Sequence, residues 1–461
     1  MRPVHLIFCL VFLSPSLYAQ RLQWVSTTAS APWAVEPSPT AILTGKPTLK
    51  VDTLSKMQAM EGFGGCFNEL GWKALGRLSP ADRAAVLREW FAPGVGANFT
   101  ICRMPVGAND FSDGWYSYDE TPGDFSLTHF SIARDRMTLV PFIHAAQRYN
   151  ARLRLWASPW SPPAWMKVNN NYACAGTASG GEGFDLFKTD EPYLRTYAQY
   201  FVKFLKAYKA EGITIGMVMP QNEFNSCQVF PSCTWTAASL NRFVGRYLGP
   251  ALQPLGVKLF FGTMERANTL LVDTLLRDPA SARYIRGVGF QWAGKGAIAG
   301  IHRLYPDLDL YQSEQECGDG HNDWTYAAYT WTLMKHYIAS GARAYMYWNL
   351  ALDEGGISHW GWRQNSLVTV DTVRHTFRYT PDYYVFKHLA HFVRPGARLV
   401  ECSGPSADDA LCFVNPDGSV VVVLASRGDT PRVEYISVGG HLFSATLPPH
   451  SFHTFILKKS V

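Results

Sequence analysis

The sequence predicts an α/β chain, a (β/α)8 TIM barrel with an attached all-β sandwich that is built from both chain ends. Eight apolar runs that end in polar or glycine-rich residues recur between residues 60 and 348, and helix-like stretches separate them. Short alternating strands follow Arg394. Because 461 residues exceed one ordinary domain, we expect a large barrel and a small companion.

The predicted barrel strands are apolar, and each ends where polar side chains begin. They cover residues 60–68, 99–104, 153–158, 213–219, 257–262, 287–291, 308–313 and 344–348. Predicted helices between and after them cover residues 83–91, 193–211, 237–248, 324–340 and 381–392. Ser79, Thr236 and Asp323 precede three of these stretches as capping residues.

The companion domain is predicted from a change of pattern after Arg394-Pro-Gly396. Turn residues there separate short alternating strands at residues 398–401, 410–414, 419–425, 432–437, 444–447 and 452–458. Strand-like residues 42–56 have no neighbours of their own, so we expect them to complete this sheet. The predicted division is a signal peptide at 1–19, N-terminal strands at 20–58, the barrel at 59–393 and the sandwich at 394–461.

Residues 1–19 have the composition of a secretory signal peptide. Arg2 precedes an apolar stretch from Val4 to Leu13, which is too short to span a bilayer. We therefore expect a secreted protein, extracellular or periplasmic. No later segment approaches ~20 uninterrupted apolar residues, so we expect no integral membrane segment after signal cleavage.

The composition favours a carbohydrate substrate and disfavours nucleic acid. A net charge of +5 without a basic run gives no reason to expect a nucleic-acid partner. Charged residues make up only 17%, aromatic residues 14%, and there are 15 tryptophans, which suits stacking on sugar rings or an aromatic-rich core. No zinc-type Cys and His spacing or phosphate-binding glycine loop occurs, so no cofactor or metal is predicted. The oligomeric state stays open.

Two carboxylates follow predicted barrel strands. The run at residues 213–219 leads into Gln221, Asn222 and Glu223, and the run at 308–313 leads into Glu314. The two glutamates are 91 residues apart, close to three barrel units of roughly 31 residues, which fits strands four and seven. One such glutamate alone is as easily an ordinary strand exit. Two facing carboxylates are the groups that glycosidic bond cleavage requires.

Glu316 is a rival to Glu314, because alternate residues of a strand face the same side. We prefer Glu314 because the Ser313-Glu314 pair directly ends the apolar run. Other polar and aromatic residues follow strand ends as well, and several tryptophans at such positions favour a sugar cleft over simple packing. They are Asp110, Trp156, Trp160, Gln291, Trp292, Trp348 and Asn349.

The sequence resembles glycoside hydrolase family 30 from about Ala41 to the end. The resemblance is carried by Gly62-Phe-Gly-Gly65, Ala157-Ser-Pro-Trp-Ser-Pro-Pro-Ala-Trp-Met-Lys167, Gln221-Asn-Glu223, Ser313-Glu314, Trp348-Asn-Leu-Ala-Leu352 and Asp417-Gly-Ser-Val-Val-Val-Val-Leu424. It implies a (β/α)8 barrel with a β-sandwich and a retaining double displacement without metal or organic cofactor.

The resemblance also implies residue roles. Glu223 matches the acid/base at strand four, and Glu314 matches the nucleophile at strand seven. Asn222 matches the amide that binds the sugar 2-hydroxyl. Asp110 matches an acid that binds hydroxyls of the −1 glucose, and Trp160 and Trp348 match walls of that subsite.

Departures from the lipid-cleaving members indicate the substrate. Gln291-Trp292-Ala293 stands where the ceramide-cleaving pattern has His, Trp and Tyr, and residues 223–235 and 289–295 are more similar to the microbial β-1,6-glucanase branch. We therefore expect a β-glucan or β-glucoside substrate, with β-1,6-glucanase activity. The alternatives are a glucosylceramidase-like enzyme and, in a different class, a non-catalytic carbohydrate-binding protein, which the presence of both glutamates disfavours.

Loops after strands four, six and eight are expected to contact the part of the substrate beyond the cleaved bond. Their aromatic residues are predicted to line a platform for a second glucose or a groove for lipid, and their polar residues favour sugar. The aromatic set is Phe230, Trp235, Trp292, Trp360 and Trp362, and the polar set is Lys295, Arg363, Gln364 and Asn365.

Nine cysteines are present, and Cys9 lies in the predicted signal peptide. Cys227 and Cys233 bracket a five-residue loop, and Cys402 and Cys412 flank a predicted hairpin. Both pairs are candidate disulfides in an exported protein, and buried free thiols are the alternative.

Overall fold

The computed structural model describes residues 22–174 and 183–458, so the predicted signal peptide lies outside the described residues. The chain forms two compact units, Met57–Leu399 and Met1–Lys56 with Val400–Val461. Within the described part of the chain, no helix combines the length and the apolarity that crossing a bilayer requires.

The first unit contains a closed barrel of eight parallel strands in the order β10-β11-β12-β5-β6-β7-β8-β9. Pairing of β12 with β5 closes the ring, with Ala344 opposite Gly62. All eight predicted strands are confirmed. The strands are β5 (Gly62–Cys66), β6 (Ile101–Pro105), β7 (Arg154–Ser158), β8 (Met217–Val218), β9 (Lys258–Met264), β10 (Ile285–Gln291), β11 (Asp309–Glu314) and β12 (Ala342–Asn349).

The glycines of β5 have a packing reason. A Cβ placed on Gly64 would lie 1.7 Å from the carbonyl oxygen of Ile101 on β6, so only glycine allows these strands to approach. Buried barrel strands need no polar face, which explains why their sequences are nearly continuous apolar runs.

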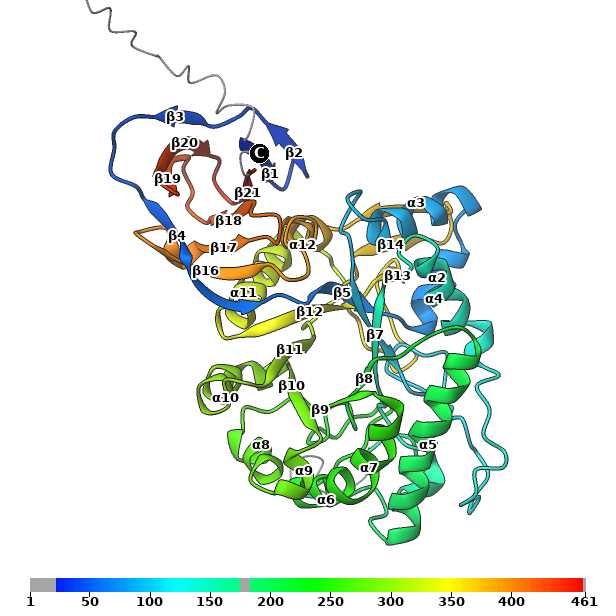
Figure 1. Ribbon diagram of the computed structural model, residues 1–461. Helices are drawn as coiled ribbons and strands as arrows, with labels where there is room; N and C mark the ends of the chain where they lie inside the picture. Colours follow the sequence, from blue (N-terminus) through cyan, green and yellow to red (C-terminus); the bar gives the residue numbers. More distant parts are fainter. Residues whose placement is uncertain (1–21, 175–182, 459–461) are drawn as a thin grey trace, which may run out of the picture. The chain divides into compact units, whose positions relative to one another are not determined.

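Helices lie outside the barrel strands, as α8 and α10 do beside β9 and β10 (Figure 1). The predicted caps are confirmed: Ser79, Thr236 and Asp323 each accept a backbone N–H of the first turn. The helix predicted at 237–248 ends as an α-helix at Phe243 and continues as a π turn over Val244–Leu248. The helices are α2 (Glu69–Gly76), α3 (Pro80–Phe91), α4 (Leu139–Gln147), α5 (Glu191–Ala210), α6 (Ala237–Phe243), α7 (Gly249–Leu252), α8 (Thr269–Leu276), α9 (Pro279–Ala282), α10 (Ile298–Leu304), α11 (Trp324–Ala339) and α12 (Pro381–Ala390).

A small sheet follows the last barrel strand. It consists of β13 (Ala351–Asp353), β14 (Val368–Asp371) and β15 (Thr376–Tyr379). The connection from β13 to β14 is the loop that carries Trp360 and Trp362.

The second unit is the predicted β-sandwich, built from both chain ends. Its ten strands follow the order β2-β1-β21-β18-β17-β16-β4-β19-β20-β3. Strand β1 pairs antiparallel with β21, from Leu22 opposite Leu457 to Thr27 opposite Phe452. The strands are β1 (Leu22–Thr27), β2 (Ala34–Glu36), β3 (Thr40–Ile42), β4 (Leu49–Ala59), β16 (Arg398–Ser403), β17 (Ala410–Val414), β18 (Val420–Ser426), β19 (Arg432–Val438), β20 (His441–Leu447) and β21 (Ser451–Leu457).

Candidate active site

Two glutamates meet at the carboxyl ends of the barrel strands. Glu314 is the last residue of β11, and Glu223 lies in the turn after β8. Both are buried, with exposures of 4% and 6%. The side chain of Gln291, the last residue of β10, lies between them. Its Nε2 is 3.0 Å from Oε1 of Glu223 and 3.2 Å from Oε2 of Glu314.

Arg103 is a central residue that the sequence analysis missed. It lies in the middle of β6, is fully buried, and its NH1 donates to Oε2 of Glu314 at 2.6 Å. Its NH2 donates to Oδ1 of Asn222 at 2.7 Å and to the hydroxyl of Ser158 at 2.8 Å. An arginine inside an otherwise apolar strand is the signal that could have found it, because a buried charge requires a partner.

The two glutamates have different electrostatic environments. Burial, the negative charge of Glu314 and that of Asp110 raise the pKa of Glu223 to about 8, against hydrogen bonding by Gln291 and the charge of Arg103. Burial also raises the pKa of Glu314, but Arg103, Trp292 and Gln291 oppose that rise directly. Glu314 therefore holds its negative charge more readily, and Glu223 holds its proton.

Two residues at this site have left-handed backbone conformations that non-glycine residues rarely adopt. They are Glu223 with φ of 46° and Trp292 with φ of 47°. The backbone N–H of Glu223 donates to Oγ1 of Thr263 at 2.9 Å, and the indole N–H of Trp292 donates to Oε1 of Glu314 at 3.3 Å. Backbone strain thus occurs at one glutamate of the pair and at a tryptophan that bonds to the other, and such strain is common at functional sites.

The amide of Asn222 is oriented by three donors. Its Oδ1 accepts from Arg103 at 2.7 Å, from the hydroxyl of Thr263 at 3.1 Å and from Gln291 at 3.1 Å. These donors assign the oxygen of the amide, so its Nδ2 points the other way. That N–H group makes no hydrogen bond within the described part of the chain and can donate to a ligand.

Asp110, Trp160 and Trp348 lie together beside the pair. Trp348 is stacked on Trp160 with ring centroids 5.0 Å apart, and its indole N–H donates to Oδ2 of Asp110 at 3.2 Å. The guanidinium of Arg103 lies 4.2 Å from the ring centroid of Trp160. Oδ1 of Asp110 is buried and bonds to none of the described residues, so it can accept from a ligand hydroxyl. Burial and Glu314 raise the pKa of Asp110 well above its usual value.

Comparison with known proteins identifies the family. The sequence profile of the Glycosyl hydrolase family 30 TIM-barrel domain matches residues 60–393, and that of the family 30 beta sandwich domain matches residues 396–455. This chain belongs to glycosyl hydrolase family 30. It is a glycoside hydrolase, and the fold predicted from the resemblance is confirmed.

Relatives of this family 30 hydrolase include enzymes with different named substrates. Lysosomal acid glucosylceramidase of Mus musculus is 30% identical over 433 residues, which cover 88% of this chain and 82% of the mouse protein. Endo-1,6-beta-D-glucanase of Neurospora crassa is 27% identical over 473 residues, covering 96% and 95%. The crystal structure of SrfJ from Salmonella typhimurium superposes with a TM-score of 0.87 at 26% identity, covering 95% of this chain and 100% of that one.

Glu316 of the family 30 hydrolase has other partners. Its carboxylate accepts from Nζ of Lys295 at 2.6 Å and from the hydroxyl of Tyr329 at 2.9 Å. Arg103 and Gln291 instead bond to Glu314. The geometry therefore groups Glu314, and not Glu316, with Glu223.

Aromatic residues from several loops pack near the barrel core that contains the site. Trp360 packs against the barrel core that contains Trp160 and Trp348. Trp115 lies 5.2 Å from Trp360 between ring centroids, and Trp362 lies 6.2 Å from Phe230. Trp115 and Trp362 are 42% and 41% exposed. Trp115 was not predicted, because its segment follows strand two and not the loops considered.

Three of the residues predicted to contact the substrate beyond the cleaved bond are buried. Trp235 is 1% exposed and stacks on Phe187 with centroids 4.2 Å apart, so it belongs to the packing behind the loop. Gln364 is buried and its Oε1 accepts from the amide of Asn349 at 2.9 Å. Asn365 is buried as well, and its Oδ1 accepts backbone N–H groups of the preceding loop. The oxygens of both amides are therefore engaged within the protein.

The candidate disulfides stay predictions. Cys233 and Cys412 are buried thiols in this structure, so neither bridge is formed here. A side-chain hydrogen bond with Cys402, followed by burial, raises the pKa of the Cys412 thiol, so these two thiols lie close together. Sγ of Cys227 donates to the carbonyl of Cys174 at 3.3 Å. Among the described His, Cys, Asp and Glu residues, no group of three is arranged to hold a metal ion.

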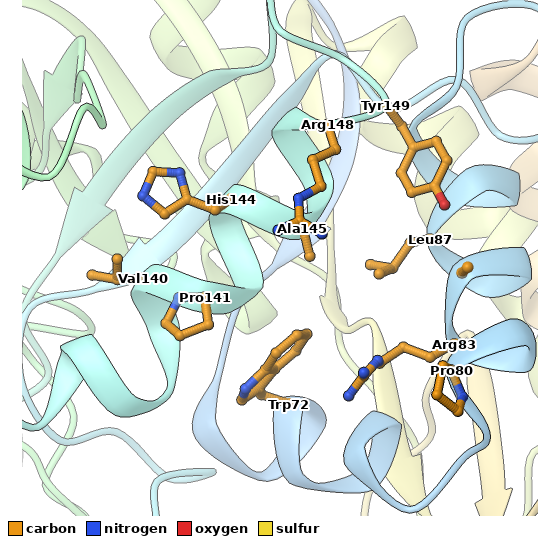
Figure 2. A pocket seen from close by; sticks show the side chains of 11 residues that line it. Trp72, Pro80, Arg83, Leu87, Val140, Pro141, His144, Ala145, Arg148 and Tyr149 are labelled. Carbon is orange, nitrogen blue, oxygen red and sulfur yellow. The ribbon is translucent and has the colours of Figure 1, made fainter.

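A separate groove of about 580 Å³ lies on the outside of the barrel between α2, α3 and α4. Figure 2 shows Trp72, Leu87 and Pro141 along it, with Arg83 and Arg148 beside them. It contains no carboxylate and none of the residues around Glu223 and Glu314. The chemistry of glycoside cleavage therefore does not lie in this groove.

Proposed function

We propose that the enzyme is a retaining β-glycosidase with Glu314 as nucleophile and Glu223 as acid/base. The observation that carries this proposal is the single amide nitrogen of Gln291 that contacts both carboxylates, at 3.0 and 3.2 Å. The two oxygens cannot be farther apart than the sum of these distances. Two carboxyl oxygens this near each other favour the separation of about 5–5.5 Å in retaining enzymes over the roughly 6.5–9.5 Å in inverting enzymes, which must admit a water.

The charges around the two carboxylates support the assignment of roles. A nucleophile must be ionised, and Glu314 forms an ion pair with Arg103 at 2.6 Å. An acid must be protonated, and burial with the nearby charge of Glu314 raises the pKa of Glu223 to about 8. Carboxylates whose environments differ in this way divide acid and nucleophile functions between them.

The reaction has two steps. A carboxylate oxygen of Glu314 attacks the anomeric carbon, the bond to the leaving oxygen breaks, and that oxygen takes the proton of Glu223. Glu223, now ionised, then takes a proton from water while the water oxygen attacks the anomeric carbon. The ester bond to Glu314 breaks, which restores its carboxylate and leaves Glu223 protonated. The configuration at the anomeric carbon is retained because it inverts twice.

A glucose unit on the non-reducing side of the cleaved bond fits the surrounding groups. We assign Nδ2 of Asn222 to the 2-hydroxyl and Oδ1 of Asp110 to a hydroxyl farther round the ring. Trp160 and Trp348 supply apolar walls, and the indole N–H of Trp348 is occupied by Asp110. Trp292 completes the enclosure beside Glu314.

For the natural substrate we propose β-1,6-linked glucan. The relative from Neurospora crassa, which is named an endo-1,6-β-D-glucanase, aligns over nearly the whole of both chains. The rings of Trp115 and Trp362 are partly exposed and offer faces and edges on which a further glucose can pack. Gln291 and Ala293 also depart from the lipid-cleaving sequence pattern.

Glucosylceramide is the second candidate, and one observation favours it. The mouse relative named lysosomal acid glucosylceramidase is 30% identical, although it aligns over less of both chains than the fungal relative does. Trp115, Trp362, Ile357 and Val229 are exposed apolar residues that a lipid chain could cover.

Product analysis on a small panel tests this proposal. The panel contains β-1,6-glucan, gentio-oligosaccharides, β-1,3-glucan, an aryl β-glucoside and glucosylceramide in detergent, with the anomer of each first product read by NMR. We expect β-products first and the highest kcat/KM on β-1,6-linked glucan. A higher kcat/KM on glucosylceramide would select the second candidate, and first products of the α-configuration would overturn the retaining mechanism.

A further inference from the structure

We infer that Gln291 is a positioning residue that determines which oxygen of Glu223 carries the catalytic proton and that serves both carboxylates in turn. The inference rests on the proposed roles of Glu223 and Glu314. It replaces the substrate-binding role expected for Gln291 from the sequence.

The polar atoms of Gln291 are all engaged within the protein. The residue is fully buried, and its Oε1 lies 2.9 Å from the hydroxyl of Ser313. Its Nε2 faces Oδ1 of Asn222 at 3.1 Å, Oε1 of Glu223 at 3.0 Å and Oε2 of Glu314 at 3.2 Å. The reversed amide would turn its oxygen towards these three oxygens, which is unfavourable, so the orientation follows from the neighbours.

An amide nitrogen has two hydrogens, and here it faces three acceptors. Asn222 has two other donors for its oxygen, Arg103 and Thr263, so it can do without Gln291. The two hydrogens are therefore available for the two carboxylates. No other described side chain contacts both Glu223 and Glu314 through one nitrogen.

The position of the proton on Glu223 follows from this contact. The N–H of Gln291 can only donate, so Oε1 of Glu223 must accept, and the unprotonated oxygen of a carboxylic acid is the stronger acceptor. The proton of the acid is therefore carried by Oε2. That oxygen makes no hydrogen bond to any described residue, so its proton is left for the leaving oxygen of the substrate.

The same amide also donates hydrogen bonds in the second half of the reaction. When Glu314 becomes an ester through Oε1, its Oε2 becomes a carbonyl oxygen that still accepts from Arg103. At that stage Glu223 is ionised, and the N–H of Gln291 stabilises its new charge. When the ester is cleaved, negative charge returns to Glu314, and the second hydrogen of Gln291 again donates to its carboxylate.

Other ionisable groups facing the pair are few. The positive charge of Arg103 lowers the pKa of both glutamates, and the negative charge of Asp110 raises the pKa of Glu223. The thiols of Cys66 and Cys317 lie near Glu314 and Asp110, and burial raises the pKa of both well above the usual value, so they stay neutral. If the N–H donors of Gln291 are removed, the change should therefore appear in the pKa values of Glu223 and Glu314.

Gln291→Met tests the inference, since it keeps the length of the side chain and removes both hydrogens. Hydrogen bonds from Gln291 lower the pKa of Glu223 and of Glu314, so both limbs of the kcat/KM profile should move to higher pH. We expect kcat to fall about 10- to 100-fold with little change in KM, most severely for alkyl β-glucosides with poor leaving groups. Gln312→Met, at another fully buried glutamine of the barrel, is the control and should move neither limb.

A direct titration separates this inference from the proposed function. The glutamate carboxyl carbons of the full chain, labelled with ¹³C and followed by NMR against pH, should titrate higher in Gln291→Met even if no tested glycoside is cleaved. If Gln291→Met does not fold, Ser313→Ala, which removes the anchor of Oε1, should give a smaller shift in the same direction. Unchanged titration, or a raised KM with unmoved pH limbs, would overturn the positioning role.

Discussion

Arg103 and Glu314 form an ion pair inside the barrel, with NH1 2.6 Å from Oε2 and both side chains at most 5% exposed. A buried charge without such a partner would be costly, so each residue stabilises the ionised form of the other. The same guanidinium also holds the oxygen of Asn222 and lies over the ring of Trp160. One side chain thus connects the nucleophile, the amide that faces the sugar and a wall of the subsite.

Replacing Arg103 by lysine should show how much the hydrogen bonds of its guanidinium contribute to activity. Lysine keeps the positive charge but cannot bond to Glu314, Asn222 and Ser158 together. We expect kcat to fall at least about 100-fold and the acid limb of activity to move to higher pH. Arg154→Lys, at an exposed pair with Glu61, is the control and should keep activity within about twofold. Wild-type kcat in Arg103→Lys would contradict this account.

Amide substitutions of the three glutamates test the assignment of roles. Glu314→Gln should remove turnover on every substrate. Glu223→Gln should slow substrates with poor leaving groups most, because they need the proton, and added azide should rescue cleavage of activated substrates. Glu316→Gln should retain activity within about tenfold, since its partners are Lys295 and Tyr329. An inactive Glu316 variant beside an active Glu314 variant would reverse the assignment.

The pH dependence of kcat/KM follows from the two pKa directions. Glu223 must be protonated in the first step, so activity should fall as pH rises through about 8, where burial and Glu314 put its pKa. Glu314 must be ionised, so activity should also fall as pH drops through its own pKa, which Arg103 holds down against burial. A profile measured with an aryl β-glucoside should be bell-shaped. Loss of the alkaline limb in Glu223→Gln would assign that limb, and its persistence would contradict the assignment.

We expect the two candidate cysteine pairs to differ in how readily they form disulfides. Cys402 and Cys412 lie on neighbouring strands β16 and β17 and are already in contact, so we expect their disulfide when the protein is made in an oxidising compartment. The bridge from Cys227 to Cys233 requires Cys227 to leave the carbonyl of Cys174. Mass spectrometry of unreduced peptides measures both. Alkylation of all eight cysteines outside residues 1–19 without reductant would exclude both bridges.

Truncation after Arg394 should give insoluble protein. In the sandwich sheet, β4 lies between β16 and β19, and β1 lies between β2 and β21, so the deletion removes both neighbours of β4 and one neighbour of β1. Their apolar side chains, such as Leu22, Trp24, Leu49 and Val51, would lose the core they share with the C-terminal strands. Recovery in the soluble fraction measures the effect against the full chain. A soluble truncated protein with full activity would contradict the expected dependence.

The order of the barrel strands was predictable from sequence because it depends on local composition. Runs such as 213–219 and 308–313 are apolar along their length and end on polar groups, and eight of them spaced along one chain leave little choice of fold. Parallel strands of a barrel place their carboxyl ends at one rim, so the strand positions of Glu223 and Glu314 already predict that the two lie together. The family motifs then added Asn222, Asp110, Trp160 and Trp348 to the same rim.

Individual contacts depended on how the barrel closes. Arg103 and Glu314 are far apart in the chain, and only the tertiary structure brings the arginine of β6 to the end of β11. In the same way Gln291 became a bridge between two carboxylates, whereas Trp235 and Asn365 turned into the protein interior. The sequence by itself determined the fold, the family and the two glutamates, because apolar periodicity and strand ends are local properties. The tertiary structure decided which polar atoms are satisfied by the protein and which are left for a substrate, because hydrogen-bond capacity is divided among neighbours that the chain brings together only on folding.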